Sequence, residues 1–315
     1  MDLLKYLDQQ PDTANGTPRM SKEEYAAMKQ QEREEVWAQI DATAQDVFKD
    51  EASLKSFLDF AAQVTPQKTA NLLLLYSQNP EIRQVKTYEK IREENHSLRP
   101  EAKGQGYLFL ADTRYEKDGV EKQGYEIRRA YDISQIRMKQ PEPMEPKTMD
   151  LLMGALLTNN PTRIQVEDRL PEGIQVQYIP KYRTVFARNG MSENVTFHAI
   201  NRGLACAALD QHNGAYQQRE AVPKALCAAY VVARKYGVEV SGFPLQKVCE
   251  LQNYGDRDPK ELRGFIHDLK NAAYSIEKHI DHNLGAPEQE FAVGDFSISD
   301  DKPEKTSKTK KQPER

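Results

Sequence analysis

Long apolar runs and cysteine frameworks are both missing from this sequence. No segment approaches the roughly 18 uninterrupted apolar residues of a membrane-spanning helix, and the opening MDLLKYLDQQ is too acidic for a secretory signal. Only three cysteines occur, and no two of them form a C-x-x-C pair. An odd number of cysteines without framework spacing is typical of a reducing compartment. We therefore expect a cytoplasmic protein that has no membrane partner.

Positive charge is also in deficit. The 44 Lys and Arg are outnumbered by 48 Asp and Glu, and the net charge is −4. The chain as a whole therefore does not attract nucleic acid, and any such binding requires a local basic surface. A glycine-rich phosphate loop is absent too, because KGQG (103–106) is too short and lacks the helix signals that would follow it. We expect no cofactor.

Length and composition predict about two domains. The chain has 315 residues, 38% of them hydrophobic, and its mean hydropathy is −0.78. Three prolines in residues 140–146 (QPEPMEP) cannot continue a helix or a strand ladder, so they mark a linker. We predict a flexible N-terminus over 1–20, a first domain over 21–139, the linker over 140–146, a second domain over 147–283 and a disordered tail over 284–315.

Residue spacing in the first domain predicts helices followed by a small antiparallel sheet. Ser21 and Glu24 have the spacing of a capping box, so a helix should begin there. Thr65 and Pro66 have the residue types of an N-cap and a first helical position, so a later helix should begin at this pair. Strand-like runs over 107–115 and 125–133 flank an Asp-Gly turn, which indicates a hairpin.

The second domain is predicted to be mainly helical with a short hairpin. Its helices are expected near 148–157, 193–209 and 222–236, with a last helix capped by Asp258 and running to about 282. Its strands are expected near 174–179 and 182–188.

The segment 201–210 (NRGLACAALD) has the frame of a zinc-protease helix without the zinc chemistry. In the H-E-x-x-H pattern, two histidines four apart hold the metal and the glutamate is the general base. Here these positions are Arg202, Gly203 and Cys206, which supply a guanidinium that keeps its proton, no side chain, and a thiol. The residues therefore argue against the metallopeptidase that the frame suggests.

Two further interpretations of this helix stay open. A metal site could be rebuilt from Cys206, Cys227 and either a histidine such as His198 or Glu220, although free cysteines more often pack as small buried hydrophobes. Arg202 could pair with Glu220 or Asp210 and bridge two helices in place of a metal, or it could simply be exposed.

Basic residues interleaved with aromatic ones make the first domain a candidate for binding nucleic acid. Sequence-tolerant binding of a single strand needs cations for the phosphates and flat rings for the bases. The same region carries nearly as many acidic residues, and aromatic residues in strands are usually core. The candidate residues are Lys86, Lys90, Arg92, Lys103, Arg114, Arg128 and Arg129.

The order of several short motifs resembles one known family. An apolar helix led by Asn71 (NLLLL) runs to Gln78 before an Asn-Pro turn, KGQG precedes a strand, and a later strand ends in YDISQ (131–135). The zincin-like frame is then followed by AYVV (229–232) and YGV (236–238). Over roughly residues 51–282, this order resembles the ArdC-type antirestriction proteins and the related LtrC-like proteins of mobile elements.

This resemblance implies a first domain associated with single-stranded DNA and a metallopeptidase-like second domain. It adds Asn71 and Gln78 to the candidate nucleic-acid-binding residues. It also places Lys224 and Leu226 where the next helix would supply an acidic third ligand. Apart from Cys206, all expected ligand and base positions are changed, so we predict a degenerate peptidase-like domain that holds no metal.

The sequence thus predicts an α+β fold: a helical N-terminal region with a small antiparallel sheet, then a zincin-like, mainly helical domain with a short β-hairpin. The leading hypothesis is a non-catalytic protein of a mobile element or phage that binds single-stranded DNA through its first domain. Antirestriction or counter-defence would be its role, with a host defence or conjugation protein as a further partner. The alternatives are a metal-dependent peptidase with a rebuilt site and a protein–protein adaptor that binds no DNA.

Overall fold

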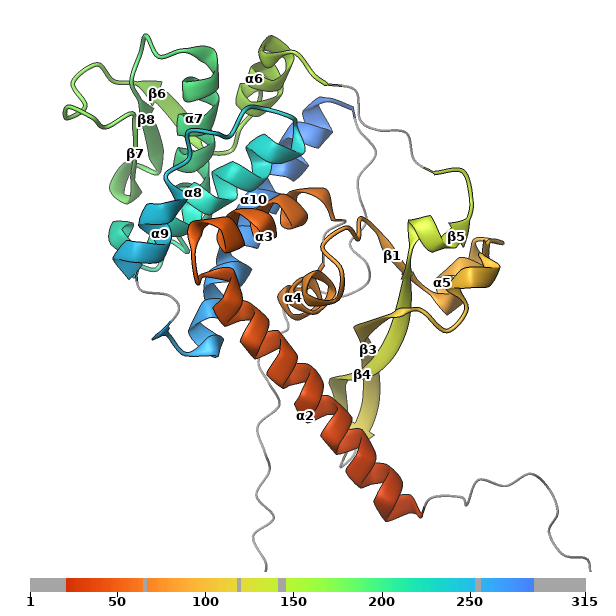
Figure 1. The fold of residues 1–315 in the computed structure, drawn as a ribbon. Coiled ribbons are helices and arrows are strands. Elements are labelled where there is room, and N and C mark those ends of the chain that lie inside the picture. Colours follow the sequence, from red (N-terminus) through yellow and green to blue (C-terminus); the bar gives the residue numbers. More distant parts are fainter. Residues whose placement is uncertain (1–20, 65–66, 118–119, 141–145, 253–255, 286–315) are drawn as a thin grey trace, which may run out of the picture. The chain divides into compact units, whose positions relative to one another are not determined.

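The computed structural model describes residues 21–64, 67–117, 120–140, 146–252 and 256–285 (Figure 1). The chain divides into two compact units, residues 1–38 and 39–315. The predicted flexible N-terminus, most of the predicted linker and all but two residues of the predicted tail lie outside the described residues. Among the described helices, none is long and apolar enough to span a membrane.

The N-terminal helices begin partly as their sequence predicts. Helix α2 (Lys22–Val47) starts with the expected capping box, in which the Glu24 N–H donates to Ser21 Oγ at 3.1 Å and the Ser21 N–H donates to the Glu24 carboxylate at 2.8 Å. Helix α3 (Glu51–Gln63) is capped by Asp50, which accepts from the Ser53 N–H. Helix α4 (Thr69–Gln78) begins after Lys68, and Thr65 and Pro66, where the sequence predicted a helix start, lie outside the described residues.

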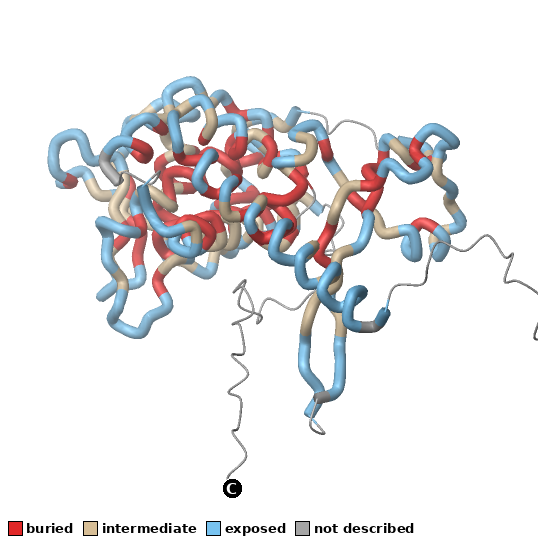
Figure 2. The backbone as a smooth tube through the Cα atoms, turned by 60° about the horizontal axis from the view of Figure 1, so that its bottom comes forward, coloured by how far each residue is buried: buried red, intermediate tan, exposed pale blue. Residues whose placement is uncertain are grey.

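A three-stranded antiparallel sheet follows, in the order β1-β4-β3. The predicted hairpin is confirmed, and Tyr107 of β3 pairs with Ala130 of β4. Both strands reach further toward the turn than predicted, while β4 ends at Asp132, one residue before its predicted end. The described residues next to the turn are exposed (Figure 2). The elements of this region are β1 (Val85–Thr87), α5 (Tyr88–Glu93), β2 (Ser97–Leu98), η1 (Pro100–Ala102), β3 (Tyr107–Lys117), β4 (Val120–Asp132), η2 (Ile133–Gln135) and β5 (Ile136–Arg137).

The second sheet contains one strand that the sequence analysis missed. The predicted hairpin of β7 (Val176–Ile179) and β8 (Thr184–Ala187) is confirmed as an antiparallel pair. Strand β6 (Arg163–Val166) adds to β8 in parallel, so the order is β6-β8-β7. The 3-10 turn η3 (Pro180–Tyr182) connects β7 to β8.

The remaining helices form most of the second half. Helix α8 begins four residues before the predicted start and carries Pro223 inside it, and helix α9 was not predicted. The cap of α10 is confirmed, because the Asp258 carboxylate accepts from the Lys260 N–H. These helices are α6 (Met149–Leu157), α7 (Glu193–Ala208), α8 (Gln218–Lys235), α9 (Leu245–Gln252) and α10 (Pro259–Asn283).

Helices on the two sides of the predicted linker pack together. The Asp59 carboxylate on α3 accepts hydrogen bonds at 2.9 Å from the Tyr230 hydroxyl and from Arg234 Nε on α8. The fold is α+β, as predicted, but α3 and α4 pack on the helices of the second half.

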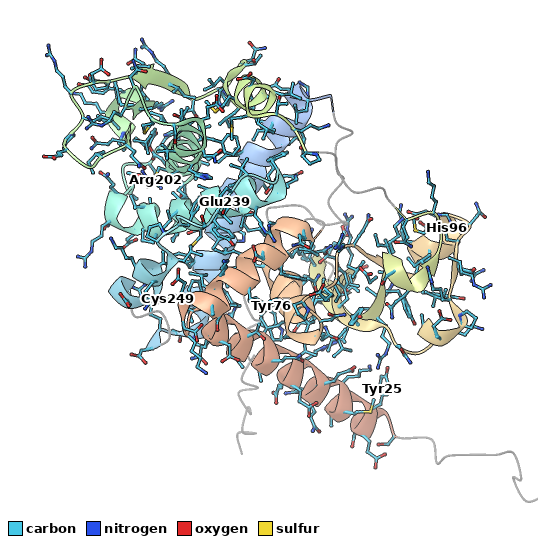
Figure 3. The ribbon with its side chains drawn as sticks, turned by 45° about the horizontal axis from the view of Figure 1, so that its top comes forward. Tyr25, Tyr76, His96, Arg202, Glu239 and Cys249 are labelled. Atoms are coloured by element: carbon cyan, nitrogen blue, oxygen red, sulfur yellow. The ribbon has the colours of Figure 1, made fainter. Side chains whose placement is uncertain are left out.

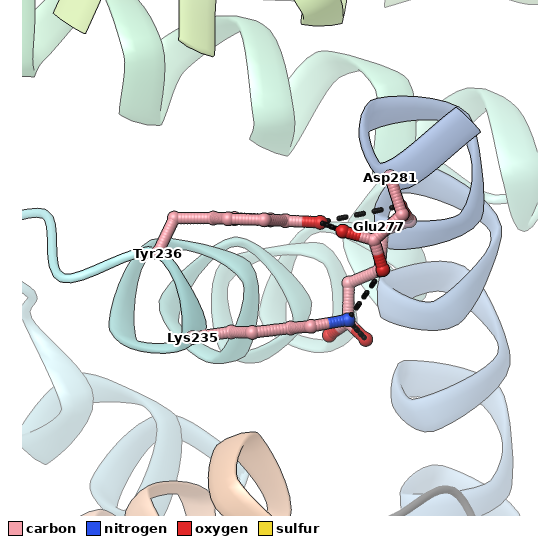
Figure 4. A network of polar contacts seen from close by, with 4 residues as sticks. All are labelled: Lys235, Tyr236, Glu277 and Asp281. Atoms are coloured by element: carbon pink, nitrogen blue, oxygen red, sulfur yellow. Dashed lines mark hydrogen bonds and ion pairs between the residues drawn. The ribbon is translucent and has the colours of Figure 1, made fainter. Parts of the chain in front are cut away.

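A buried charge cluster joins the end of α8 to α10 (Figure 4). Lys235 Nζ lies 3.0 Å from a carboxylate oxygen of Glu277 and 3.0 Å from one of Asp281. The Tyr236 hydroxyl donates to Asp281 at 2.6 Å. Burial raises the pKa of Glu277, whereas for Lys235 burial is outweighed by the two nearby carboxylates, which raise its pKa.

Candidate functional site

Gly203, at the general-base position of the frame, faces the second sheet rather than a cleft. A Cβ added there would lie 2.5 Å from Val185 Cγ1 and 2.8 Å from Val176 Cγ2. Both valines belong to the β7–β8 hairpin, and Val185 is fully buried. The absence of a side chain at Gly203 therefore lets α7 approach the sheet, and no side chain fits at this position without movement of the strands.

The two ligand positions of the frame hold Arg202 and Cys206, which lie one turn apart on α7. Arg202 is labelled in Figure 3. Arg202 is half-buried, and its guanidinium donates to the Gln175 side-chain oxygen at 3.4 Å. Burial raises the pKa of the Cys206 thiol, and the lowering effects of Tyr216 and Arg202 do not cancel it. Since the thiolate is the form that attacks and binds metals, this thiol is poorly suited to either task.

Arg202 does not make the helix bridge that one interpretation of the sequence offered. Glu220 is exposed, and Asp210 is held elsewhere. The Asp210 carboxylate accepts from the Tyr178 hydroxyl at 2.9 Å and from the His212 N–H at 2.8 Å. Burial opposes ionisation of Asp210, but these hydrogen bonds outweigh it and hold its pKa below its usual range. Burial and the same hydrogen bond raise the pKa of Tyr178 to about 12.

The third-ligand positions on α8 are also occupied by structural contacts. Lys224 forms an ion pair with Asp268 on α10 at 2.5 Å, and its Nζ lies 5.9 Å from the centre of the Phe265 ring. Leu226 is a buried core residue. Neither side chain supplies an oxygen, nitrogen or sulfur ligand to a metal beside Cys206.

The residues proposed for a rebuilt metal site do not come together. Cys206 has Arg202 and Tyr216 as its neighbours, whereas Cys227 lies near Cys249. The His198 ring places Nε2 2.8 Å from the Glu239 backbone oxygen. Within the described ranges, no three His, Cys, Asp or Glu side chains are grouped closely enough to hold a metal ion.

Asn71 and Gln78 both complete the free edge of strand β3. The Asn71 amide donates to the Leu110 oxygen at 3.0 Å and accepts from the Leu110 N–H at 2.8 Å. Gln78 forms the same pair of bonds with Leu108, at 3.1 Å and 2.7 Å. An unpaired buried backbone group is costly, and these two side-chain amides satisfy backbone groups of β3 in place of a neighbouring strand. Asn71 is 2% exposed, so it presents no group to a ligand at the surface.

The YDISQ segment is likewise used for structure. The Asp132 carboxylate accepts from the N–H groups of Arg83, Gln84 and Ser134. Gln135 closes a capping box by accepting from the Asp132 N–H at 2.9 Å and also donates to the Gln105 oxygen at 3.0 Å. This segment therefore ties the end of β4 to two neighbouring loops.

The predicted basic residues divide into neutralised and free ones. Three of them pair with carboxylates: Lys86 with Glu94, Arg114 with Glu121 at 3.6 Å, and Arg128 with Glu89 at 3.5 Å and with Glu126. Arg129 is exposed and donates to the Gly106 oxygen at 2.6 Å. Lys90, Arg92 and Lys103 are exposed, and no carboxylate in the described part of the chain pairs with them. The strand register also places Arg114 and Arg129 on one face of the sheet and Arg128 on the other.

Two further free cations were missed by the sequence analysis. Strands β2 and β5 pair so that Leu98 and Ile136 turn toward a small core formed with Ile91, Tyr131 and Ile133. Arg99 and Arg137 consequently lie on the outer side of this pair, both exposed. No local pattern marks two such short strands, so only their pairing could reveal these residues. We define the cationic lobe as Lys90, Arg92, Arg99, Lys103 and Arg137.

Comparison with known proteins found a likeness only at the level of structure. No family model matches the sequence, and no curated protein matches it. The metal-free crystal structure of the antirestriction protein ArdC from plasmid R388 is similar with a TM-score of 0.48 and 13% identity, over 76% of this chain and 98% of that one. The Mn(II)-bound structure of that protein gives a TM-score of 0.47 and 13% identity, over 75% and 97% of the two chains.

Proposed function

We propose that this protein binds single-stranded nucleic acid through the cationic lobe and hydrolyses no peptide. The observation that carries the proposal is the absence of ion-pair partners for the five cations of the lobe among the described residues. Residues 82–140 contain 13 Lys and Arg against 10 Asp and Glu, in a chain whose net charge is −4. A local excess of unpaired cations attracts a polyanion even when the whole chain is acidic.

The lobe also offers what a flexible strand requires besides charge. Most of its cations neighbour in sequence the residues of one small core, since Lys90 and Arg92 flank the buried Ile91 on α5, and Arg99 and Arg137 follow Leu98 and Ile136. Lys103 follows η1. Tyr88, at the start of α5, is 50% exposed and presents a flat face for a base. Cations spread over a surface with an exposed ring suit binding that does not depend on base sequence.

The second part of the proposal, the lack of peptidase chemistry, is supported by the frame on α7. A guanidinium, a missing side chain and a buried thiol of raised pKa replace two ligands and a base. Antirestriction or counter-defence, with a defence or conjugation protein as partner, is the role that the sequence resemblance implies for such a binding protein.

Binding is tested by fluorescence anisotropy of labelled oligothymidylate at two salt concentrations. Five phosphate contacts predict a slope of about −3.5 for log affinity against log salt, so a rise from about 50 to about 200 mM weakens binding by about 100-fold. Arg99→Gln with Arg137→Gln should flatten the slope by about 1.4. Arg114→Gln is the matched control, because that guanidinium already pairs with Glu121. Absence of binding at low salt would refute the proposal.

Peptidase activity is tested separately with a fluorogenic protease substrate in the presence of added Zn²⁺ or Mn²⁺. We expect no hydrolysis above the background of the metal alone. Hydrolysis that disappears in the Cys206→Ser variant would overturn this part of the proposal and favour a rebuilt metal site.

A further inference from the structure

A second group of unpaired cations gathers at one end of the β6-β8-β7 sheet. Arg163, the first residue of β6, is paired in register with Thr184, the first residue of β8. Ile179, the last residue of β7, lies opposite the same Thr184. The turn between these strands carries Lys181, Tyr182 and Arg183, so it projects at the end where Arg163 lies. We define the β7–β8 corner as Arg163, Lys181, Tyr182 and Arg183.

The charge of this corner is not neutralised within the described chain. All four of its residues are exposed, and Tyr182 is 60% exposed. Across the described residues, no carboxylate lies within ion-pair distance of its three cations. Lys181 Nζ lies 5.6 Å from the centre of the Tyr182 ring, so a cation and an aromatic ring are presented together.

The turn holds these side chains in a defined arrangement. The Arg183 N–H donates to the Pro180 oxygen at 3.1 Å, and Arg183 has left-handed backbone angles of φ 48° and ψ 41°. Such a conformation is uncommon for a residue other than glycine and costs of order 1 kcal/mol or more. The buried Thr184 hydroxyl donates to the Tyr182 oxygen at 2.8 Å. The exposed Tyr182 ring therefore belongs to a turn whose backbone is held by these two hydrogen bonds.

We propose that the β7–β8 corner is a second contact surface for single-stranded nucleic acid, with Tyr182 stacking on a base and the three cations contacting phosphates. The choice of ligand rests on the proposed function, but the surface is a different one. Exposed aliphatic residues that would favour a lipid surface, Val166 and Ile174, belong to the opposite end of the sheet. A ring flanked by cations at intervals along the chain suits a strand of alternating bases and phosphates.

The experiment compares corner and lobe variants in the same anisotropy titration of oligothymidylate. Arg163→Gln, Lys181→Gln and Arg183→Asn remove the three charges together, and Asn tolerates the left-handed backbone of Arg183. Lobe and corner together offer eight phosphate contacts, so the wild-type slope should steepen from about −3.5 for the lobe alone to about −5.6, and we expect this triple variant to flatten it by about 2. Tyr182→Leu should weaken binding by roughly 5- to 150-fold, whereas Tyr182→Phe, which keeps the ring, should not.

Arg169→Gln is the matched control, since Arg169 is an exposed cation in the loop that follows β6. Circular dichroism and the thermal midpoint show whether each variant is folded. If the corner variants keep the wild-type affinity and salt slope while the lobe variants bind weakly, this inference is overturned and the proposal for the lobe stands. Loss in the corner variants with unchanged lobe variants would support it and overturn the lobe assignment. No binding by the wild-type protein, or binding of the corner only to anionic vesicles or an acidic peptide, would overturn it as well.

Discussion

Replacing Gly203 with alanine tests the tight contact between α7 and the second sheet. The added Cβ would lie 2.5 Å from Val185 Cγ1, about 1 Å inside the usual 3.5–4.0 Å separation of carbon atoms. Val185 lies on the central strand of its sheet and is fully buried, and Val176 closes the other side. Because both valines are β-branched, neither can rotate away freely, and the strands themselves must move.

Two effects of opposite sign decide the expected change in stability. Alanine in place of glycine inside a helix stabilises by about 1 kcal/mol. Inserting a methyl group into a packed interface typically costs about 1–3 kcal/mol, and a contact this short belongs in the upper part of that range. We therefore expect Gly203→Ala to lower the free energy of unfolding by about 1–2 kcal/mol, the difference of these two effects.

Gly264→Ala is the matched control, because Gly264 lies inside α10 and no atom is within 4 Å of its added Cβ. The same substitution should there raise the free energy of unfolding by about 0.5–1 kcal/mol. Urea unfolding followed by circular dichroism measures both, with equal m-values as the check that one transition is compared. The double variant Gly203→Ala/Val185→Ala should be more stable than the sum of its single changes by about 1 kcal/mol or more.

If Gly203→Ala stabilises the protein as Gly264→Ala does, the reasoning is refuted. In that case α7 and the strands have room for a side chain, and the packing argument against a general base at this position is lost.

Three more predictions concern buried polar groups. Lys235→Met should cost about 3–5 kcal/mol in urea unfolding because it leaves the Glu277 carboxylate buried without its cation, and adding Glu277→Leu should recover much of this loss; no recovery would contradict the pairing. Asn71→Ala leaves two backbone groups of β3 unpaired and should cost about 2–4 kcal/mol, with faster hydrogen exchange of the freed β3 amide as the specific sign. The pKa of Asp210 is lowered in the folded state, so its stabilisation is present above its unfolded value of about 3.9 and is lost as the pH falls through the folded value. Asp210→Asn should therefore flatten the fall in stability below about pH 4, and an unchanged acid limb would contradict this assignment.

Short sequence patterns correctly predicted those helix starts and strands that are stabilised by contacts between residues close in sequence. The capping residues of α2 and α10 and the β3–β4 hairpin depend on neighbours close in sequence, and each was found. Strand β6 was missed because its four residues gain their role from a parallel partner elsewhere in the chain. The start of α8 was expected near Val222, whereas the helix begins at Gln218 and continues through the buried Ala221 and through Pro223.

The sequence predicted which residue types the candidate site contains, but not which ion-pair or hydrogen-bond partner each residue has in the fold. Sequence identifies Arg114 and Lys90 as equal cations, whereas the fold pairs the first with Glu121 and leaves the second without a carboxylate among the described residues. In the same way, Asn71 has the donor and acceptor of a base-reading side chain, but the edge of β3 occupies both. Contacts between residues far apart in sequence decide which polar groups stay available to a ligand, and short sequence patterns do not reveal those contacts.

Gly203 occupies the position of the general base in the α7 frame, and it is also the residue at which α7 packs against the second sheet. Writing histidine, glutamate and histidine at positions 202, 203 and 206 would create the H-E-x-x-H pattern in sequence. The glutamate would still place its Cβ against Val185 and Val176, and the third-ligand position would still hold Lys224, paired with Asp268. A working site would therefore require smaller residues on both strands and a new acidic ligand on α8. For that reason the packing around Gly203, as well as the residue types at positions 202 and 206, distinguishes this helix from one with the H-E-x-x-H pattern.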